Sequence, residues 1–341
     1  MPPIQSVRWS ANERGVRIID QRLLPNDFVE RDLTTLDDVC DAIQTLAVRG
    51  APAIGICGAI GLCVALSDQA QLGRGEFLVR ARSAAHTISS TRPTAVNLSW
   101  ALERVLGRGE RTAGESVAVL QAMCDEATAI LVEDRAMCRR IGEAGASLIA
   151  DGSRILTHCN AGALATGGIG TALAPVYVAA SEGKNVCVLA TETRPLLQGS
   201  RLTAWELTRA GIPVTVITDS AAAARMRAGE VDLCIVGADR VVANGDVANK
   251  VGTYSLAVLA HHHNIPFYVA MPSSTIDPSL ESGTDITIEE RDPREVSTLG
   301  DRRVTAEHAA VGNAAFDVTP AELITAFITD QGMVLPPYHF K

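Results

Sequence analysis

The chain has 341 residues, of which 47% are hydrophobic and 4% aromatic, and it carries a formal net charge of -9. A chain of this length can bury a large core, and a prior of about 150 residues per domain predicts two domains. The acidic balance and the few aromatic rings argue against a nucleic-acid binder, which needs a basic surface and stacking platforms. A small anionic ligand stays compatible with this charge, because it needs only a local basic cluster.

The chain is expected to be cytoplasmic and to have no membrane partner. No apolar run reaches the roughly 18 residues of a membrane helix. The start, MPPIQSVRWS, shows neither the basic nor the apolar region of a signal peptide. The 8 cysteines contain no CxxC pair, so neither a zinc ribbon nor a disulfide scaffold is indicated. Most of them are expected to be small buried hydrophobes.

The first part of the chain is predicted to be a mainly helical domain, residues 1–125, with short strands such as Val16 to Ile19 at its start. Breaks are expected at Arg92-Pro93 and at Gly107 to Gly109. The windows with helical spacing or composition are Leu36 to Val48, Ala53 to Leu66, Gly75 to Ser90, Ala95 to Leu106 and Ser116 to Ala150.

The second domain, residues 126–341, is predicted to be α/β, with a doubly wound, Rossmann-like parallel sheet. Short β-branched runs alternate with helical windows, and their nearly continuous apolarity fits strands buried on both faces. The predicted strands are Arg154 to His158, Asn185 to Ala190, Pro213 to Thr218, Leu233 to Gly237 and Pro266 to Ala270. The predicted helices are Gly168 to Glu182, Leu202 to Ala210, Ser220 to Ala228 and Asn249 to His262.

Polar residues follow each predicted strand. Open parallel sheets bind ligands beyond the carboxyl ends of their strands, so these residues are expected to gather at one rim. They are Cys159-Asn160, Thr191-Glu192-Thr193-Arg194, Asp219-Ser220, Asp239-Arg240 and Ser273-Ser274-Thr275.

Cys159 and Asp239 are the two candidates for chemistry at this rim. Cys159 ends an apolar run before a glycine-rich turn, where a helix start and nearby basic residues would favour the thiolate. Asp239 follows the apolar run LCIVGA, where burial would favour the protonated carboxyl of a general acid. The alternatives are a packing role for Cys159 and a simple ion pair between Asp239 and Arg240.

The glycine-rich stretch Gly162 to Gly170 has two interpretations. Its backbone N–H groups could approach a phosphate, or its glycines could allow close packing of a strand and a helix. It lacks the GxGxxG pattern, and Gly168 stands where a P-loop needs Lys, so a nucleotide site is not expected. The tract His261 to His263 lacks the i, i+4 spacing of a metal site and fits a helix C-terminus.

Three basic residues stand near helix boundaries. Arg49 and Arg92 lie at breaks in the first domain, and Lys250 is expected to open the helix after Asn249. Taken singly, each is better explained as a solvated surface charge than as a ligand to an anion.

Several longer motifs carry a resemblance to a known family. The chain resembles the S-methyl-5-thioribose-1-phosphate isomerase family nearly end to end, with no departure at a position that the family uses for chemistry. The motifs are RGAPAIG from Arg49, THCNAGALATGGIGTAL from Thr157, ETRP from Glu192 with Gln198-Gly199, GADRVVANGDVANKVGTY from Gly237, PSSTID from Pro272, IEER from Ile288 and FDVTP from Phe316.

This resemblance implies an aldose-ketose isomerase of methionine salvage. The substrate would be S-methyl-5-thio-D-ribose 1-phosphate and the product S-methyl-5-thio-D-ribulose 1-phosphate. Cys159 and Asp239 would be the catalytic pair, in a homodimer that uses neither metal nor organic cofactor. The residues implied to hold the phosphate and sugar are Arg49, Gly50, Ala51, Arg92, Gln198, Asn249 and Lys250.

The chemistry of such a substrate agrees with two catalytic groups that converge on one crevice. A sugar phosphorylated on its anomeric carbon has no free aldehyde, so an acid must first open the ring, and Asp239 is the candidate. Hydrogen then moves from C2 to C1 through a base such as a Cys159 thiolate, or by direct hydride shift in a dry pocket. The sequence does not choose between these routes.

Two alternatives share the implied fold. A ribose-1,5-bisphosphate isomerase would need extra basic residues near C5 of the sugar, where a methylthio group needs an apolar pocket. The regulatory subunits of the eukaryotic nucleotide-exchange factor for translation initiation are binding modules. They are disfavoured because both Cys159 and Asp239 are present.

Overall fold

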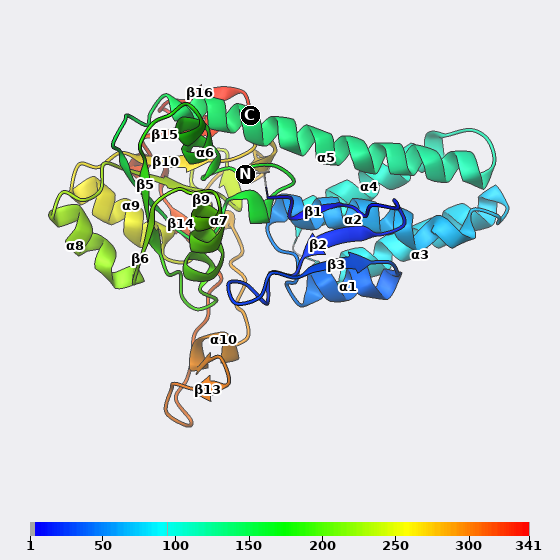
Figure 1. The fold of residues 1–341 in the computed structure, drawn as a ribbon, viewed down its shortest axis with the longest axis horizontal. Coiled ribbons are helices and arrows are strands. Elements are labelled where there is room, and N and C mark those ends of the chain that lie inside the picture. The colour runs from blue at the N-terminus through cyan, green and yellow to red at the C-terminus, as the bar shows by residue number, and fades with distance from the viewer. Residues whose placement is uncertain (1–3, 94, 341) are drawn as a thin grey trace. The chain divides into compact units, whose positions relative to one another are not determined.

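The computed structural model describes residues 4–93 and 95–340. Contacts divide the chain into two compact units: unit 1 is Met1–Cys138 with Gly162–Gly170, and unit 2 is Arg139–Ala161 with Thr171–Lys341. The boundary between the two units lies within the long helix α5 (Ser116–Ala146) (Figure 1). The residues of α5 up to Cys138 belong to unit 1, and those from Arg139 belong to unit 2.

Unit 1 is mainly helical, as predicted. A small antiparallel sheet in the order β1-β2-β3 comes first and includes the predicted strand at residues 16–19. The predicted helices follow, and their apolar faces form one buried cluster with the sheet. The bounds are β1 (Val7–Trp9), β2 (Val16–Ile19), β3 (Glu30–Leu33), α1 (Leu36–Gln44), α2 (Ala51–Leu66), α3 (Arg74–Ser90) and α4 (Val96–Arg111).

Helix α2 forms the centre of unit 1. It packs against α1, α3 and α4, and all its residues after Pro52 are buried except Ala65. The stretch Ala51–Gln69, 19 residues with a hydropathy of 1.7, is long and apolar enough to cross a membrane, contrary to the sequence expectation. However, 72% of its most apolar window is buried inside the chain, which identifies a core helix.

The expected break at Gly107 to Gly109 is wrong, because α4 continues through both glycines to Arg111. Gly109 is buried, and a Cβ there would lie 2.9 Å from the Cγ and Sδ atoms of Met123 on α5. The glycine therefore permits close helix packing and does not end the helix.

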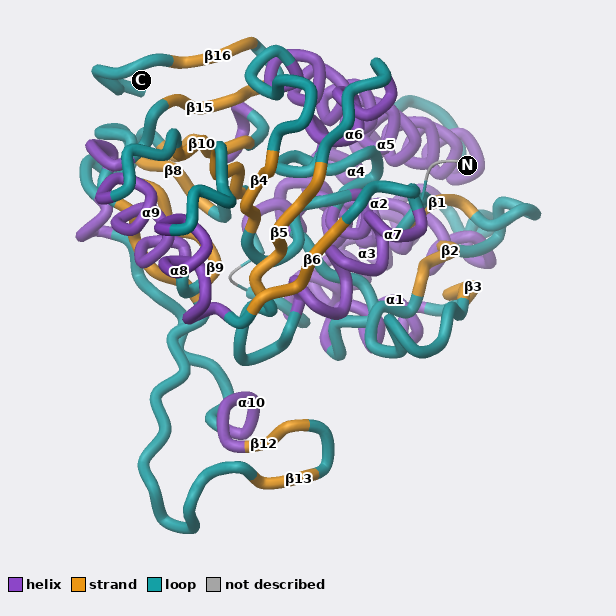
Figure 2. The backbone as a smooth tube through the Cα atoms, turned by 60° about the vertical axis from the view of Figure 1, so that its left-hand side comes forward, coloured by secondary structure: helices purple, strands orange, loops and turns teal. Residues whose placement is uncertain are grey.

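Unit 2 contains a seven-stranded sheet in the order β16-β15-β10-β7-β4-β5-β6. All pairs are parallel except β15 with β16, and Figure 2 shows β4, β5 and β6 side by side. All five predicted strands are present. The bounds are β4 (Arg154–Thr157), β5 (Cys187–Thr191), β6 (Val214–Ile217), β7 (Leu233–Val236), β10 (Phe267–Ala270), β15 (Ala326–Thr329) and β16 (Gly332–Val334).

The helices of unit 2 begin later than the sequence predicted in two places. The helix expected from Gly168 begins at Ala174, because the glycine-rich stretch is an irregular loop. The helix expected from Asn249 begins at Thr253, because Asn249 and Lys250 end a strand and Gly252, with φ 106°, starts the helix. The bounds are α6 (Ala174–Ser181), α7 (Ala204–Arg209), α8 (Ala222–Arg227) and α9 (Thr253–His262).

A second sheet of unit 2, in the order β11-β8-β9-β14, was not predicted. Its strands span only two to four residues and mix apolar with polar side chains, so they lack the continuous apolar runs that marked the large sheet. An arm with α10 (Arg294–Ser297), β12 (Thr298–Leu299) and β13 (Arg302–Arg303) projects from this sheet (Figure 2). The strands of the sheet are β8 (Arg240–Val242), β9 (Val247–Lys250), β11 (Ile276–Asp277) and β14 (Phe316–Thr319).

Candidate active site

The catalytic candidates lie beyond the ends of two neighbouring strands. Strands β4 and β7 pair in parallel, with Leu156 beside Cys234, and Cys159 and Asp239 follow these strands in the chain. The sequence-adjacent strands β5 and β6 lie on one side of β4, whereas β7 lies on the other, so the strand order reverses at this point. Ligands of open parallel sheets bind at such a reversal.

Cys159 has a constrained backbone. Its φ of 61° lies in the left-handed region, which costs a residue with a Cβ about 1 kcal/mol or more. Two threonine hydroxyls hold this conformation: the Cys159 N–H donates to Thr193 Oγ1 at 2.9 Å, and Thr203 Oγ1 donates to the Cys159 carbonyl at 2.6 Å. The residue is 9% exposed, so the thiol is in a largely desolvated position.

The loop after β5 is fixed in the same way. Thr193 has a φ of 66°, and its N–H and that of Arg194 donate to the two oxygens of Asp219, at 2.7 and 2.8 Å. Asp219 follows β6, so its carboxylate links the ends of adjacent strands. This rim carboxylate therefore has a structural role in the described chain.

His158 connects the strand of Cys159 to the segment after Lys250. Its Nε2 donates to the Val251 carbonyl at 2.8 Å, since a carbonyl can only accept, and Nδ1 accepts from Thr191 Oγ1 at 2.6 Å. Burial lowers the pKa of His158, more than the Val251 hydrogen bond and Asp219 raise it. A neutral imidazole thus holds two rim segments together.

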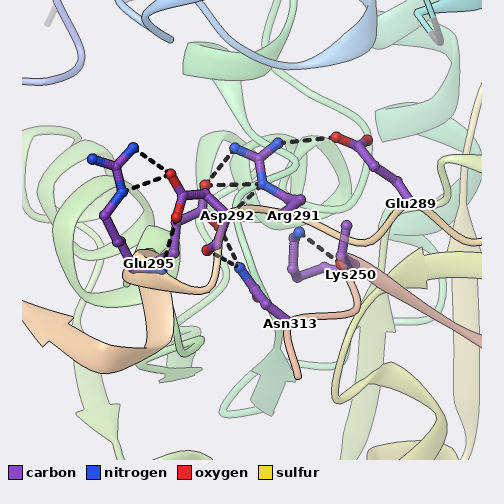
Figure 3. Close-up of polar contacts among 8 residues, drawn as sticks. Lys250, Glu289, Arg291, Asp292, Glu295 and Asn313 are labelled. Carbon is purple, nitrogen blue, oxygen red and sulfur yellow. Dashed lines mark hydrogen bonds and ion pairs between the residues drawn. The ribbon is translucent and has the colours of Figure 1, made fainter. Parts of the chain in front are cut away.

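Asn249 and Lys250 belong to a strand of the second sheet. Asn249 is buried, and its Nδ2 donates to Thr253 Oγ1 at 3.0 Å. Lys250 pairs with Phe316 across β9 and β14, and its Nζ lies 4.8 Å from that ring. The Nζ also donates to the Ala315 carbonyl at 2.8 Å (Figure 3). The ammonium of Lys250 is therefore held by Ala315 and by the ring of Phe316.

An ion pair of the arm is within electrostatic reach of Lys250. Arg291 binds Glu295 with N···O distances of 2.6 to 3.0 Å, and Asn313 Nδ2 donates to Glu295 at 3.0 Å (Figure 3). Burial raises the pKa of Glu295, but Arg291, Asn313 and Lys250 together lower it by more. Sequence analysis found Arg291 only as part of the IEER motif and missed Glu295 and Asn313, whose partners are close only in space.

Gln198 is buried at 7% exposed, just before a π-helical turn at Gly199–Thr203. Its Oε1 is buried and has no hydrogen-bond partner among the described residues. A Cβ at Gly199 would lie 1.7 Å from the Thr191 carbonyl, so only glycine fits there. The amide oxygen is thus available to accept a hydrogen bond from a bound hydroxyl.

The other expected ligands lie in unit 1. Gly50 precedes α2 with a φ of 91°, and a Cβ there would lie 2.5 Å from the Ala165 carbonyl oxygen. Ala51 is the exposed first residue of α2. Arg49, before α2, and Arg92, after α3, are half-buried. Each unit therefore places its own share of the expected residues at helix or strand ends.

The expectation of a desolvated Asp239 is wrong. The strand before it is buried, but Asp239 itself is exposed. Its N–H donates to the Ala248 carbonyl at 2.9 Å, so its backbone belongs to the small sheet. The neighbouring Arg240 forms an ion pair with Asp277 at 3.0 Å.

The histidine tract lies at a helix C-terminus and most cysteines are buried, as predicted. His261 and His262 are the last residues of α9, and the rings of His262 and His263 meet edge to face. All eight cysteines are free, and Cys57, Cys63, Cys138 and Cys234 are buried, whereas Cys187 is half-buried. Within residues 4–93 and 95–340, no group of three His, Cys, Asp or Glu side chains could hold a metal ion.

Residues 47–336 match the model of the initiation factor 2 subunit family. The chain belongs to this family. It is 54% identical over 337 residues to a 5-deoxyribose 1-phosphate isomerase of Moorella thermoacetica, covering 98% of this chain and 95% of that protein. It is also 54% identical over 338 residues to a methylthioribose-1-phosphate isomerase of Gemmatimonas aurantiaca, with coverage of 98% and 95%.

Solved structures agree with this assignment. A 5-methylthioribose 1-phosphate isomerase of Pyrococcus horikoshii is 44% identical with a TM-score of 0.94, covering 99% of this chain and 94% of that one. A protein of A. fulgidus described as translation initiation factor eIF-2B, subunit delta, is 44% identical with a TM-score of 0.91 and coverage of 98% and 97%. The family resemblance inferred from sequence motifs is confirmed.

Proposed function

We propose that this chain is an aldose-ketose isomerase that converts S-methyl-5-thio-D-ribose 1-phosphate to S-methyl-5-thio-D-ribulose 1-phosphate in methionine salvage. The observation that carries the proposal is the placement of Cys159 and Asp239 after two adjacent parallel strands, at the reversal of strand order. Relatives named methylthioribose-1-phosphate isomerase, 52 to 54% identical over nearly the whole chain, support it.

Each catalytic candidate has a distinct role in this reaction. Asp239 protonates the ring oxygen and opens the sugar, for which its exposed carboxyl is accessible to a ligand. Cys159, as thiolate, removes the C2 proton and returns it to C1; in the alternative route the hydrogen moves directly from C2 to C1 as a hydride. In either route the C2 hydroxyl gives its proton to the carboxylate of Asp239, which completes the ketone and restores the acid. The low exposure of Cys159, 9%, is compatible with either route.

Seven further residues are proposed to bind the substrate. Guanidinium and ammonium groups neutralise the phosphate through charge-assisted hydrogen bonds, and the unpartnered Oε1 of Gln198 accepts from a sugar hydroxyl. Loss of a phosphate ligand should raise KM more than it lowers kcat. The proposed ligands are Arg49, Gly50, Ala51, Arg92, Gln198, Asn249 and Lys250.

The deciding experiment compares Cys159→Ser and Asp239→Asn with the wild-type chain on S-methyl-5-thio-D-ribose 1-phosphate. Each variant should lose kcat by about a thousandfold or more while keeping its circular dichroism. Cys187→Ser and Asp125→Asn, at half-buried and exposed positions, are the matched controls and should keep kcat. Ketose formation followed by NMR is the measurement, and full activity in either catalytic variant would refute its assigned role.

A second candidate is an isomerase of other 5-substituted ribose 1-phosphates. One relative is named 5-deoxyribose 1-phosphate isomerase. Comparing kcat/KM for the 5-methylthio, 5-deoxy and 5-phospho sugars decides between them. A non-catalytic binding module, as the eIF-2B name of one solved structure suggests, requires that none of the three is turned over.

The proposal extends to the organisation of the enzyme. We assign residues 126–341 to a Rossmann-like catalytic domain and residues 1–125 to the helical domain, acting as a cytoplasmic homodimer without metal or organic cofactor. Light scattering after size exclusion tests the dimer. Full activity after dialysis against EDTA is the expected result for a cofactor-independent reaction, and a chelator-sensitive rate would contradict it.

A further inference from the structure

The glycine-rich segment Gly162–Gly170, here called the glycine loop, has its two ends in unit 2. The Ala161 carbonyl accepts hydrogen bonds from the N–H groups of Thr171, at 2.9 Å, and Leu173, at 3.3 Å. The loop itself belongs to unit 1. It begins directly after the segment Cys159-Asn160-Ala161, so its position bears on the backbone of the cysteine.

Two adjacent residues of α5 hold the tip of the glycine loop. The Gly167 N–H donates to Asp134 Oδ2 at 2.6 Å, and Arg135 Nε donates to the Gly167 carbonyl at 3.1 Å. The N–H and the carbonyl of Gly167 are therefore both bound by the same turn of the helix. About one turn later, after Cys138, α5 passes out of unit 1.

The packing of the loop supports an anchoring role. A Cβ on Gly167 would lie 2.7 Å from Leu131 Cδ1 and 2.8 Å from Ile56 Cδ1, and one on Gly168 would lie 2.9 Å from Cys138 Cβ. The glycines thus let the loop lie directly on α5 and α2. Of the two interpretations drawn from the sequence, close packing explains these two glycines.

Asp134 is costly to bury. It is 5% exposed, and burial raises its pKa to about 6, against the lowering effect of the Gly167 N–H, Cys138 and Arg135. The titratable groups that act on it, Arg135 and Cys138, are both on α5; the loop contributes backbone amides and α2 contributes Ile56. Because folding raises the pKa of Asp134, its ionised form lowers the stability of the fold at neutral pH. Another favourable effect of the carboxylate must therefore compensate for this cost.

We propose that Asp134 is a positioning residue, whose carboxylate anchors the glycine loop to α5 and thereby fixes the backbone that carries Cys159. The effect of this anchor on catalysis rests on the proposed function, whereas the attachment of the loop to α5 rests on the hydrogen bonds of Gly167 alone. The charged form grips the Gly167 N–H more strongly than the protonated form, because hydrogen bonds to ionised acceptors are the stronger ones. While Asp134 stays buried, release of the loop should therefore be easier in acid, because the Gly167 N–H lowers the pKa of the buried carboxyl. Global unfolding hydrates Asp134 and has the opposite pH dependence.

The test compares Asp134→Ala and Asp134→Asn with the wild-type chain. Asp125→Ala, an exposed acid on the same helix, is the matched control. Asp134→Ala should raise amide exchange in residues 166–170 by about tenfold and change the rate of Cys159 alkylation by iodoacetamide by about threefold or more. It should lower kcat by about tenfold with a smaller effect on KM, because misplacement acts on the reacting geometry.

Asp134→Asn keeps an acceptor for Gly167 but cannot titrate. It should restore most of the kcat at pH 8 and remove the loss of loop protection that the wild type shows between pH 8 and pH 5. Unchanged loop exchange and Cys159 alkylation in folded Asp134→Ala would overturn the proposal. If that variant does not fold, identical pH profiles of loop exchange in Asp134→Asn and wild type would overturn it. If the wild-type chain does not turn over S-methyl-5-thio-D-ribose 1-phosphate, the proposed function is contradicted. Amide exchange in the loop and alkylation of Cys159 then still test whether Asp134 anchors the loop.

Discussion

Backbone strain marks the rim of the large sheet. Cys159 and Thr193 both have left-handed φ values, and the Thr193 hydroxyl accepts the N–H of Cys159. Residues with a Cβ hold such conformations only where neighbouring groups over-determine them, and such positions cluster at active sites. A glycine could adopt this left-handed conformation without strain, but it would have no thiol. The hydrogen bonds of the Thr193 and Thr203 hydroxyls stabilise the same conformation at Cys159.

Thr193→Val tests this arrangement. Valine has nearly the shape of threonine but leaves the buried Cys159 N–H without its acceptor, which should cost about 1–3 kcal/mol of unfolding free energy. Thr215→Val, at an exposed position of β6, is the control and should change stability by less than about 0.5 kcal/mol. Urea unfolding measures both, and equal losses would show that the hydroxyl of Thr193 has no special role.

Asp134 has a predictable effect on stability against pH. Its pKa is about 6 in the folded chain and 3.8 as the ordinary value, so folding takes up a proton between these values. The stability that this group contributes is fully present below pH 3.8 and is lost as pH rises through 6. The difference is on the order of 3 kcal/mol.

Asp134→Asn should therefore unfold at higher urea concentration than wild type at pH 8, and this advantage should shrink toward pH 4.5. The asparagine keeps a neutral acceptor at all pH values, so only the wild type titrates. Paired urea curves across this range are the measurement. An advantage that stays constant with pH would contradict a raised pKa.

At the scale of elements, the ends of helices depended on local chemistry. Helix α1 begins at a capping box in which Thr35 and Asp38 bind each other's backbone N–H groups. Helix α2 has no side-chain cap; Gly50 at φ 91° turns the chain into it, and Pro52 occupies its first turn. The glycine is needed twice at this point, for its φ and because Ala165 lies against it.

Gly50→Ala should accordingly cost more than Gly152→Ala. Both glycines have positive φ, 91° and 82°, but a Cβ at Gly152 meets nothing within 4 Å. The control should lose about 1 kcal/mol from backbone strain alone, and Gly50→Ala about 2–3 kcal/mol or more from strain plus overlap. Thermal and urea unfolding of the two variants measure the loss of stability. Equal losses would contradict a steric contribution at Gly50.

At the scale of the whole molecule, Asp20 and Glu295 change stability with pH in the opposite direction to Asp134. Arg22 lowers the pKa of Asp20, although burial of this carboxylate raises it. Arg291 and Asn313 likewise lower the pKa of Glu295 by more than burial raises it. These groups contribute stability that is present above their ordinary pKa values. That stability is lost as pH falls through their lowered folded values.

The chain should therefore be most stable in mildly acidic solution, below the pKa of Asp134 and above the range in which the paired carboxylates protonate. Below about pH 4 stability should fall steeply. Asp20→Asn should flatten this acid limb, because its ion pairs with Arg22 and Arg31 no longer titrate. Tm measured from pH 3 to pH 8 tests the profile, and an unchanged acid limb in Asp20→Asn would contradict the assignment.

Much of the large-scale organisation could be inferred from residue order. The predicted strands of the large sheet and the helices of unit 1 are present, because long apolar runs and helical spacing reflect local chain geometry. The small sheet and the arm were missed. Their strands are short and contain no continuous apolar run, and they form through pairing between segments as far apart as Asn249 and Asp317.

The choice of Cys159 and Asp239 as catalytic candidates, and the likeness of the surrounding motifs to one family, followed from the sequence alone, since motifs are contiguous in the chain. Their geometry did not: the exposure of Asp239, the strand position of Lys250 and the grip of Asp134 on Gly167 required the folded chain. Desolvation, strand pairing and hydrogen bonding to distant backbone depend on which segments meet, and local residue order carries little of that information.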